Sequence, residues 1–360
     1  MRITRRVRGL SPFVHGEQPR GLDVIKLNTN EAAYPPSRKV MAELGKIAPE
    51  SLRRYPDAEF SDLRVELARL HRTRKENVFV GNGSDEILSL LTGAFVEDDE
   101  IVCTLDPSYS LYRALASIRG VEWRGIEWGA DGLKSRPPAK CSLFIWTNPN
   151  NPTGTLVPAR KIAALARSFR GVVAVDEAYA DYASSNCLGL ATSSRNRNVI
   201  VMRTFSKAYS LAGLRVGYCI GPADLIGALY RIKESYNVDA VAQQVACAAV
   251  RDQAGLRSTV RKVLKTRARF VAALAKRGWD VIPSEANFVF ARPPVAKPGT
   301  AGRDAFAVAK HVFETLRERK IFIRYFDGPK TGDRVRITIG TDAQMKSVLR
   351  AIDDILSGPA

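Results

Sequence analysis

The sequence has few cysteines, few histidines and no long apolar run, and each shortage excludes a class of protein. Its 360 residues include five cysteines and three histidines, all far apart. This spacing provides neither a disulfide framework nor a metal cluster, so we expect reduced, buried cysteines in a cytoplasmic protein without a metal. No stretch reaches the roughly 18 apolar residues of a membrane span, and the N-terminal residues lack the apolar core of a secretory signal.

Acidic residues are also scarce relative to basic ones. The chain has 55 Lys and Arg against 37 Asp and Glu, which gives a net charge of +18. The basic residues are spread along the chain without a nucleic-acid-binding motif, and the dense stretch Lys262–Arg269 alternates with apolar residues as a solvated helix face does. We therefore expect no nucleic-acid partner and a basic surface that suits small anionic substrates.

Between about residues 60 and 275, short β-branched runs alternate with longer helical stretches. The expected strands are Val78–Val80, Ile101–Leu105, Leu143–Thr147, Val172–Val175, Val199–Arg203 and Val216–Ile220. The expected helices include Ser84–Val96, Pro158–Phe169, with Pro158 at its first position, and Pro222–Glu234. Apolar strands separated by helices predict an α/β fold with a mostly parallel sheet covered on both faces, and ligands bind at the carboxyl ends of such strands.

The remaining sequence predicts a smaller α+β domain and an N-terminal arm. The expected strands are Trp279–Ile282, Asn287–Ala291, Ile321–Arg324 and Val335–Ile339, with helices at Arg303–Arg319 and Asp342–Ser357 and a loop at Pro293–Gly302. Residues 1–44 have four prolines and little periodicity. We therefore expect an arm and part of the small domain in 1–44, a large domain in 45–275 and the C-terminal small domain in 276–360.

Four polar clusters each follow an expected strand. They are Gly81–Glu86, Asn148–Gly154, Asp176–Tyr179 and Thr204–Ala208. Taken singly, the first three are also explained as turns or helix caps. Lys207 is harder to explain in that way, because burial at a strand end penalises the charged ammonium and lowers its pKa. A lysine with a lowered pKa suits Schiff-base chemistry.

In combination and in this order, these clusters resemble the fold-type-I pyridoxal-phosphate aminotransferases. The resemblance rests on the strings N-P-x-N-P-T-G, D-E-A-Y and S-K-x-x-x-L-A-G-L-R. The segments Leu27–Glu31, Tyr55–Asp57, Lys233–Val238 and Val335–Gly340 are similar to the histidinol-phosphate aminotransferase branch of that family. The resemblance covers nearly the whole chain. It implies a mostly parallel seven-stranded sheet in the large domain, pyridoxal 5'-phosphate as cofactor, an amino donor, a 2-oxo acid acceptor and a homodimer with shared active sites.

The resemblance also implies roles for individual residues. Lys207 would hold the cofactor and move the substrate proton, while Asp176 would pair with the ring nitrogen. Asn151 and Tyr179 would hydrogen-bond the phenolic oxygen, and Tyr109 would stack on the ring. The phosphate would be held by Gly83, Ser84, Asp85, Ser206 and Arg215, with Tyr55 arriving from the neighbouring subunit. The substrate would be bound by Arg324, Arg336, Asn30 and Tyr236.

One residue departs from the family pattern. Phe13 stands where many members have a tyrosine that binds the substrate phosphate, and the lost hydrogen bond is worth about 0.5–1.5 kcal/mol. The leading hypothesis is transfer of an amino group from L-histidinol phosphate to 2-oxoglutarate in histidine biosynthesis. Aromatic amino acid transamination and threonine-phosphate decarboxylation stay open. A nucleic-acid-binding protein with a vestigial fold is disfavoured, because Lys207, Asp176 and Arg215 are intact.

Overall fold

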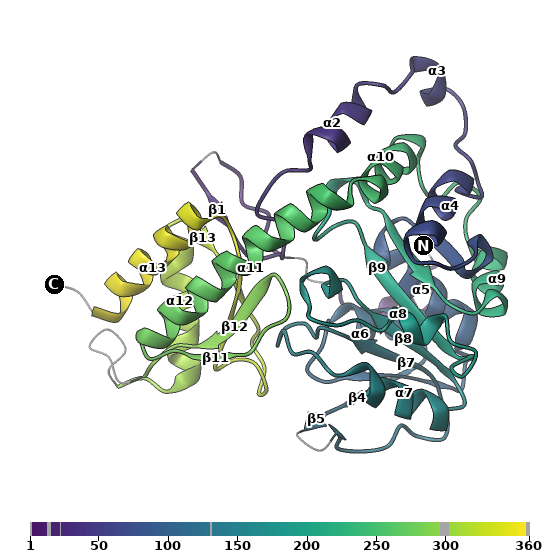
Figure 1. Cartoon of the computed structure of the whole chain (residues 1–360). Helices are drawn as coiled ribbons and strands as arrows, with labels where there is room; N and C mark the ends of the chain where they lie inside the picture. Colours follow the sequence, from purple (N-terminus) through teal and green to yellow (C-terminus); the bar gives the residue numbers. More distant parts are fainter. Residues whose placement is uncertain (1, 13–15, 22, 130–131, 296–301, 358–360) are drawn as a thin grey trace.

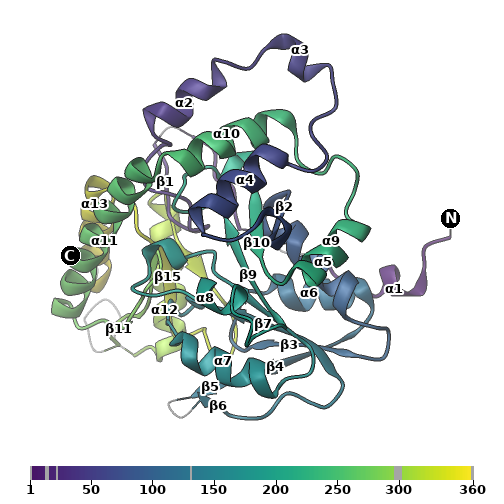
Figure 2. The same ribbon diagram turned by 45° about the vertical axis from the view of Figure 1, so that its right-hand side comes forward.

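The chain forms a large and a small α/β body joined by one long helix (Figure 1). The computed structural model describes residues 2–12, 16–21, 23–129, 132–295 and 302–357. Phe13 and most of the expected loop Pro293–Gly302 lie outside the described residues. The joining helix, α11 (Gln253–Lys276), runs from the large body along the small one in both ribbon views (Figures 1 and 2).

The large body is built on the predicted seven-stranded sheet. In spatial order its strands are β2 (Val78–Gly81), β10 (Gly217–Ile220), β9 (Val199–Thr204), β8 (Val172–Asp176), β7 (Cys141–Thr147), β3 (Ile101–Leu105) and β4 (Glu122–Ile126). β10 is antiparallel to both neighbours, and the other pairs are parallel. Every strand except β4 is buried almost throughout, which explains the near-continuous apolar runs.

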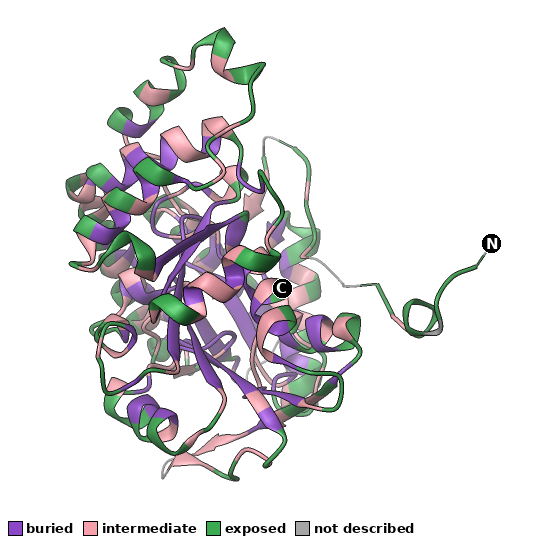
Figure 3. Cartoon of the chain, turned by 90° about the vertical axis from the view of Figure 1, so that its right-hand side faces the viewer, coloured by how far each residue is buried: buried purple, intermediate pink, exposed green. Residues whose placement is uncertain are grey.

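Helices cover both faces of this sheet because successive strand residues point to opposite sides. Along β8, Val173 and Val175 join one core cluster, whereas Val172 and Ala174 join the other. The first cluster includes residues of α4 (Ser61–Leu70), α7 (Ala159–Ser168), α8 (Leu188–Ala191) and α10 (Ala240–Arg251). The second includes residues of α5 (Gly83–Phe95), α6 (Leu111–Arg119) and α9 (Ala223–Ile232). Figure 3 shows the buried sheet between helical layers that combine buried and exposed residues.

The small body combines an antiparallel sheet with helices. Its strand order is β11 (Asp280–Ile282), β12 (Phe288–Arg292), β15 (Val335–Thr338) and β14 (Arg324–Tyr325). α12 (Ala305–Glu318), α13 (Asp342–Ser357) and residues of α11 from Val260 onward share its core. Because α11 is continuous up to Lys276, the division of the chain at residue 275 stays a prediction.

The arm joins the small body through strand pairing. β1 (Ile25–Lys26) pairs in parallel with β13 (Ile321–Phe322). The single strand predicted at Ile321–Arg324 is therefore wrong: the chain changes sheets at the buried Ile323, so that β13 pairs with β1 and β14 with β15. Pro158 also differs from the prediction, since it caps α7 instead of starting it.

Short elements complete the described chain. They are α1 (Arg5–Arg8), α2 (Arg38–Leu44), α3 (Pro49–Leu52), the β5–β6 pair (Trp128–Gly129 and Gly132–Leu133) and three 3-10 turns (Lys75–Asn77, Ala180–Tyr182 and Ala212–Leu214). α3 projects from the main body in Figures 1 and 2, whereas α2 packs against α10 and buries Val40 in the first core cluster. Among the described residues, no helix combines the length and apolar character of a membrane span.

Candidate active site

A cavity of about 550 Å³ opens where β7, β8 and β9 end, between the sheet, the arm and the small body. Thr147, Asp176 and Thr204, the last residues of these strands, all line it. This position is the one expected for ligands of a parallel sheet. Most of the sequence-predicted site residues also line it: Asn30, Ser84, Asp85, Tyr109, Asn151, Asp176, Tyr179, Ser206, Lys207, Arg215, Arg324 and Arg336.

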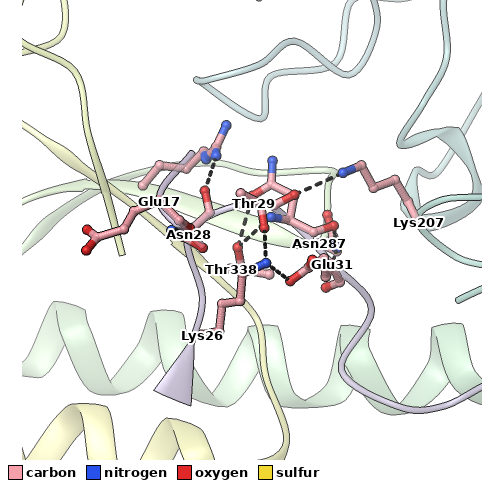
Figure 4. Close-up of polar contacts among 10 residues, drawn as sticks. Glu17, Lys26, Asn28, Thr29, Glu31, Lys207, Asn287 and Thr338 are labelled. Carbon is pink, nitrogen blue, oxygen red and sulfur yellow. Dashed lines mark hydrogen bonds and ion pairs between the residues drawn. The ribbon is translucent and has the colours of Figure 1, made fainter. Parts of the chain in front are cut away.

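Lys207 follows β9 and extends across the cavity toward the arm. Its Nζ donates a hydrogen bond of 3.0 Å to the main-chain oxygen of Thr29 (Figure 4). Burial, together with the positive charge of Arg336, lowers the pKa of Lys207 to about 8. Near neutral pH this amine therefore exchanges its proton far more readily than an exposed lysine does.

Asp176 is a buried carboxylate held by two hydrogen bonds. Its Oδ2 accepts a bond of 2.8 Å from the Tyr112 hydroxyl, and its Oδ1 accepts one of 3.0 Å from the Ala178 N–H. Burial raises the pKa of Asp176, and these two bonds oppose the rise. A buried carboxylate of this kind is best stabilised by a cationic N–H donor, which a protonated ring nitrogen would supply.

Gly83, Asp85, Ser206 and Arg215 come together at the start of α5. Gly83 has a φ of +79°, and a Cβ there would lie 2.5 Å from Nη2 of Arg215. The guanidinium of Arg215 lies 3.4 Å from the Ser206 hydroxyl and 3.0 Å from an Asp85 carboxylate oxygen. The first amides of α5, one hydroxyl and one planar guanidinium are suited to binding a phosphate.

Arg336 is a buried cation with an incomplete set of partners. It is only 6% exposed, and it donates 2.6 Å to Asn151 Oδ1 and 2.7 Å to the Asn28 main-chain oxygen. Its Nε has no hydrogen-bond partner within the described chain. Because a guanidinium only donates, the oxygen of Asn151 must face it, which leaves the Asn151 amide N–H groups to donate elsewhere.

A second arginine lies directly beside the first. Arg324 on β14 is opposite Arg336 on β15 in the antiparallel register, so both side chains leave the same face of the sheet. Both line the cavity, and neither forms an ion pair with any residue that the structure describes. Burial lowers the pKa of Arg336 to about 10, so it stays charged at neutral pH. Two neighbouring cations without a carboxylate partner are chemically suited to binding an anionic ligand.

The arm and two aromatic residues supply parts of the site that the sequence analysis did not identify. Thr29, Glu31 and Gln18 of the arm line the cavity, as do Tyr112 and Phe326. Thr29 and Glu31 belong to the recognised segment Leu27–Glu31. Tyr112 lies in the first turn of α6, three residues after Tyr109, and its main-chain N–H donates a hydrogen bond of 3.2 Å to the Tyr109 oxygen.

Tyr179 and Asn30 are joined across the cavity wall. Asn30 donates a hydrogen bond of 2.9 Å to the Tyr179 hydroxyl. Burial raises the pKa of Tyr179, so its hydroxyl stays protonated and can act as a donor. Tyr109 packs edge-on against Tyr112 with ring centres 5.5 Å apart and faces the same cavity.

Tyr55 and Tyr236 do not line this cavity. They stack on each other at the surface, with ring centres 4.4 Å apart, and are 80% and 46% exposed. Within a single chain these two predicted site residues therefore lie outside the cavity that the other twelve line, while Gly83 adjoins the cavity residue Arg215.

Comparisons with known proteins agree with this geometry. The family described as aminotransferase class I and II matches residues 22–352. A histidinol-phosphate aminotransferase of Geobacter sp. (strain M21) is 41% identical over 99% of both chains, and a histidinol-phosphate aminotransferase 2 of Rhizobium meliloti (strain 1021) is 40% identical over 97% of this chain and 98% of its own.

A solved structure extends the match to three dimensions. The histidinol-phosphate aminotransferase of Sinorhizobium meliloti in complex with pyridoxal-5'-phosphate superposes with a TM-score of 0.88 at 27% identity, over 99% of this chain and 97% of that one. The family predicted from the motifs is thus confirmed. The chain belongs to the class I and II aminotransferases.

Proposed function

We propose that this chain transfers the amino group of L-histidinol phosphate to 2-oxoglutarate, with pyridoxal 5'-phosphate as cofactor. The observation that carries the substrate class is the pair Arg324 and Arg336, two adjacent cations that face the cavity. A substrate phosphate in one half-reaction and an acceptor carboxylate in the other both suit such a pair. Relatives at about 40% identity over nearly the full length bear the corresponding name.

The residues present fit the cofactor. Gly83 has a φ of +79°, which side chains rarely adopt, and the bare backbone there lies beside the Arg215 guanidinium, so that its amides, Ser206 and Arg215 would together bind the cofactor phosphate. Asp176 supplies the carboxylate for the ring nitrogen, and Asn151 retains free amide donors for the phenolic oxygen. When bound, pyridoxal 5'-phosphate acts as an electron sink for the carbanion formed at the substrate Cα.

The chain's own residues supply binding and proton movement. Lys207 has a pKa of about 8, so its neutral amine can accept the Cα proton and its protonated form can return it. Asp176 provides negative charge at the base of the cavity, since both of its oxygens are fixed by donors. The arginine pair orients the substrate by its anionic end, which leaves the amino group directed toward Lys207.

We also propose a cytoplasmic homodimer. The support for a dimer is the exposed apolar surface of α2 and α3, where Met41 is 47%, Leu44 is 38% and Leu52 is 64% exposed, close to the stacked Tyr55–Tyr236 pair. In a dimer Tyr55 would complete the phosphate site of the other subunit.

The support for a cytoplasmic location is that the five cysteines are free and buried.

Borohydride trapping tests this proposal. The protein loaded with pyridoxal 5'-phosphate is reduced and digested, and the modified peptide is identified by mass spectrometry. We expect the label on Lys207, no label in Lys207→Ala, and unchanged labelling in the control Lys276→Ala at the exposed end of α11. The wild type should also form glutamate from 2-oxoglutarate when L-histidinol phosphate is supplied. A label on another lysine, or release of carbon dioxide in place of glutamate formation, would contradict the proposal.

A further inference from the structure

A chain of buried hydrogen bonds connects the small body to Tyr179 through the arm. Thr338, the last residue of β15, is 2% exposed. Its hydroxyl accepts a bond of 3.1 Å from the Asn30 main-chain N–H and donates one of 3.0 Å to Asn30 Oδ1. The amide nitrogen of Asn30 then donates to the Tyr179 hydroxyl at 2.9 Å. Figure 4 shows Thr338 against the arm, with Lys207 approaching Thr29 from the other side.

These bonds fix the direction in which each group donates. Because Asn30 Oδ1 faces the Thr338 hydroxyl, the amide nitrogen of Asn30 must face Tyr179. The oxygen of Tyr179 therefore accepts, and its own hydrogen points away from Asn30. Tyr179 lines the cavity, so this hydrogen is available to an acceptor there. Rotation of the Asn30 amide would reverse the arrangement.

The backbone of Asn30 is held as firmly as its side chain. Asn30 is 1% exposed and has a φ of +55°, in the left-handed region that few residues other than glycine and asparagine adopt. The side chain of Asn287, just before β12, donates 3.1 Å to its main-chain oxygen. The small body thus anchors Asn30 at two points, while Tyr179 belongs to the large body.

We propose that Thr338 is a positioning residue, which holds Asn30 so that Tyr179 donates its hydroxyl hydrogen to the phenolic oxygen of the bound cofactor. This inference rests on the proposed function. It makes the orientation of one cofactor contact depend on the small body, because the relay crosses from β15 through the arm to the segment after β8.

Other groups facing Tyr179 are left in place by a change at Thr338. The charged ones are Arg336 on β15, Asp176 on β8, Asp85 on α5 and Lys207, whose Nζ lies 5.9 Å from the ring centre. Phe288 packs edge-on against the Tyr179 ring at 5.1 Å. Thr338→Val preserves shape and removes only the hydroxyl, so an effect on Tyr179 must pass through Asn30.

The test is a pH titration of the visible absorbance of the bound cofactor. A hydrogen bond donated to the phenolic oxygen stabilises its negative charge. This stabilisation is greatest after the bound cofactor has lost the titrating proton that lies beside this oxygen. Weakening the bond in Thr338→Val should therefore raise the titration midpoint, by about 0.4 to 1 pH unit for one hydrogen bond. Thr338→Ser keeps the hydroxyl and should titrate like the wild type.

Two further variants show whether the effect passes through the relay. In a Tyr179→Phe background, adding Thr338→Val should cause no further change in the midpoint. Asn30→Gly tolerates the positive φ and removes the side-chain amide, so it should raise the midpoint as Thr338→Val does. It therefore tests the relay independently if Thr338→Val does not fold.

The outcomes separate this inference from the proposed function. An unchanged midpoint in a folded Thr338→Val or Asn30→Gly protein would overturn the positioning role. A shift of the same size in the Tyr179→Phe background would also overturn it, since a structural disturbance would then act without the tyrosine. If the wild type acquires no visible absorbance with pyridoxal 5'-phosphate, the proposed function itself fails.

Discussion

At Lys207, burial and a neighbouring cation act on the amine in the same direction. Desolvation disfavours the ammonium, and Arg336 repels it, so that the pKa falls to about 8. The sequence predicted the first effect from the position of the lysine at a strand end. The second depends on Arg336, which is distant along the chain and reaches the same cavity only in the folded protein.

The cofactor-free protein should therefore show an unusually reactive Lys207. We expect pulse acylation of Lys207, followed by mass spectrometry, to rise with a midpoint near pH 8 and not near 10.5. In Arg336→Gln the midpoint should move upward, because removal of the positive charge restores stability to the ammonium. An unmoved midpoint in that variant, or one near 10.5 in the wild type, would contradict the electrostatic account.

Asp176 should control the rate more than the binding of the cofactor. Asp176→Asn keeps the size of the side chain but cannot hold a ring nitrogen protonated, so we expect kcat to fall roughly a hundredfold or more while the cofactor stays bound. The matched control is Asp181→Asn, on the same segment, where the carboxylate lies 3.6 Å from Arg203 and away from the cavity. That control should lower stability and leave kcat nearly intact. Near-normal kcat in Asp176→Asn would remove the residue from its role.

At the scale of secondary structure, the β14–β15 pair carries the two arginines that we propose bind the substrate. Antiparallel pairing puts Arg324 opposite Arg336, and the ring centre of Phe326, which also lines the cavity, lies 5.5 and 5.2 Å from their respective guanidinium carbons. Neither strand is long, so the register of a few residues decides whether both cations face the same ligand.

Arg324→Ala should therefore affect phosphate-bearing donors selectively. We expect its KM for L-histidinol phosphate to rise about tenfold or more, and its KM for phenylalanine to rise much less, since a dianion uses both cations more fully than a carboxylate does. Arg292→Ala, at the exposed end of β12, is the control and should change neither value. Equal effects on the two donors would favour the aromatic aminotransferase hypothesis.

Elements with a strong apolar pattern were predictable from the sequence, and elements defined by pairing were not. β8 and β9 are buried on both faces and were predicted to within a residue at each end. β4 was missed because it is an edge strand, with Glu122 and Arg124 exposed between less exposed neighbours. Thr338 was missed because its contact with Asn30 joins residues 308 positions apart, a proximity that no local pattern encodes.

At the scale of the whole molecule, the two bodies are tied together beside the cavity. Lys330, in the loop after β14, forms ion pairs of 2.6 Å with Asp106 after β3 and 2.5 Å with Glu127 after β4. Asp106 lies three residues before Tyr109, which lines the cavity. These contacts hold the loop that carries Phe326 against the large body.

Loss of the Lys330 ion pairs should moderately increase the mobility of the loop beside the cavity. Lys330 is 40% exposed, so each ion pair is worth little in water, and we expect Lys330→Met to raise KM for both substrates about two- to fivefold with a smaller change in kcat. Amide hydrogen exchange in residues 326–334 should accelerate in the same variant. Lys310→Met, on the exposed face of α12, should behave like the wild type. Unchanged exchange and KM in Lys330→Met would show that the tie does not hold the bodies together.

Comparison of kcat/KM for L-histidinol phosphate and for phenylalanine, each with 2-oxoglutarate as acceptor, shows whether the paired arginines select a phosphate-bearing donor. Two cations at the substrate end predict a preference for the phosphate-bearing donor, of roughly tenfold or more for one charge-assisted hydrogen bond beyond those that a carboxylate makes. A kcat/KM for phenylalanine equal to or above that for L-histidinol phosphate would contradict the account and identify an aromatic amino acid as the donor.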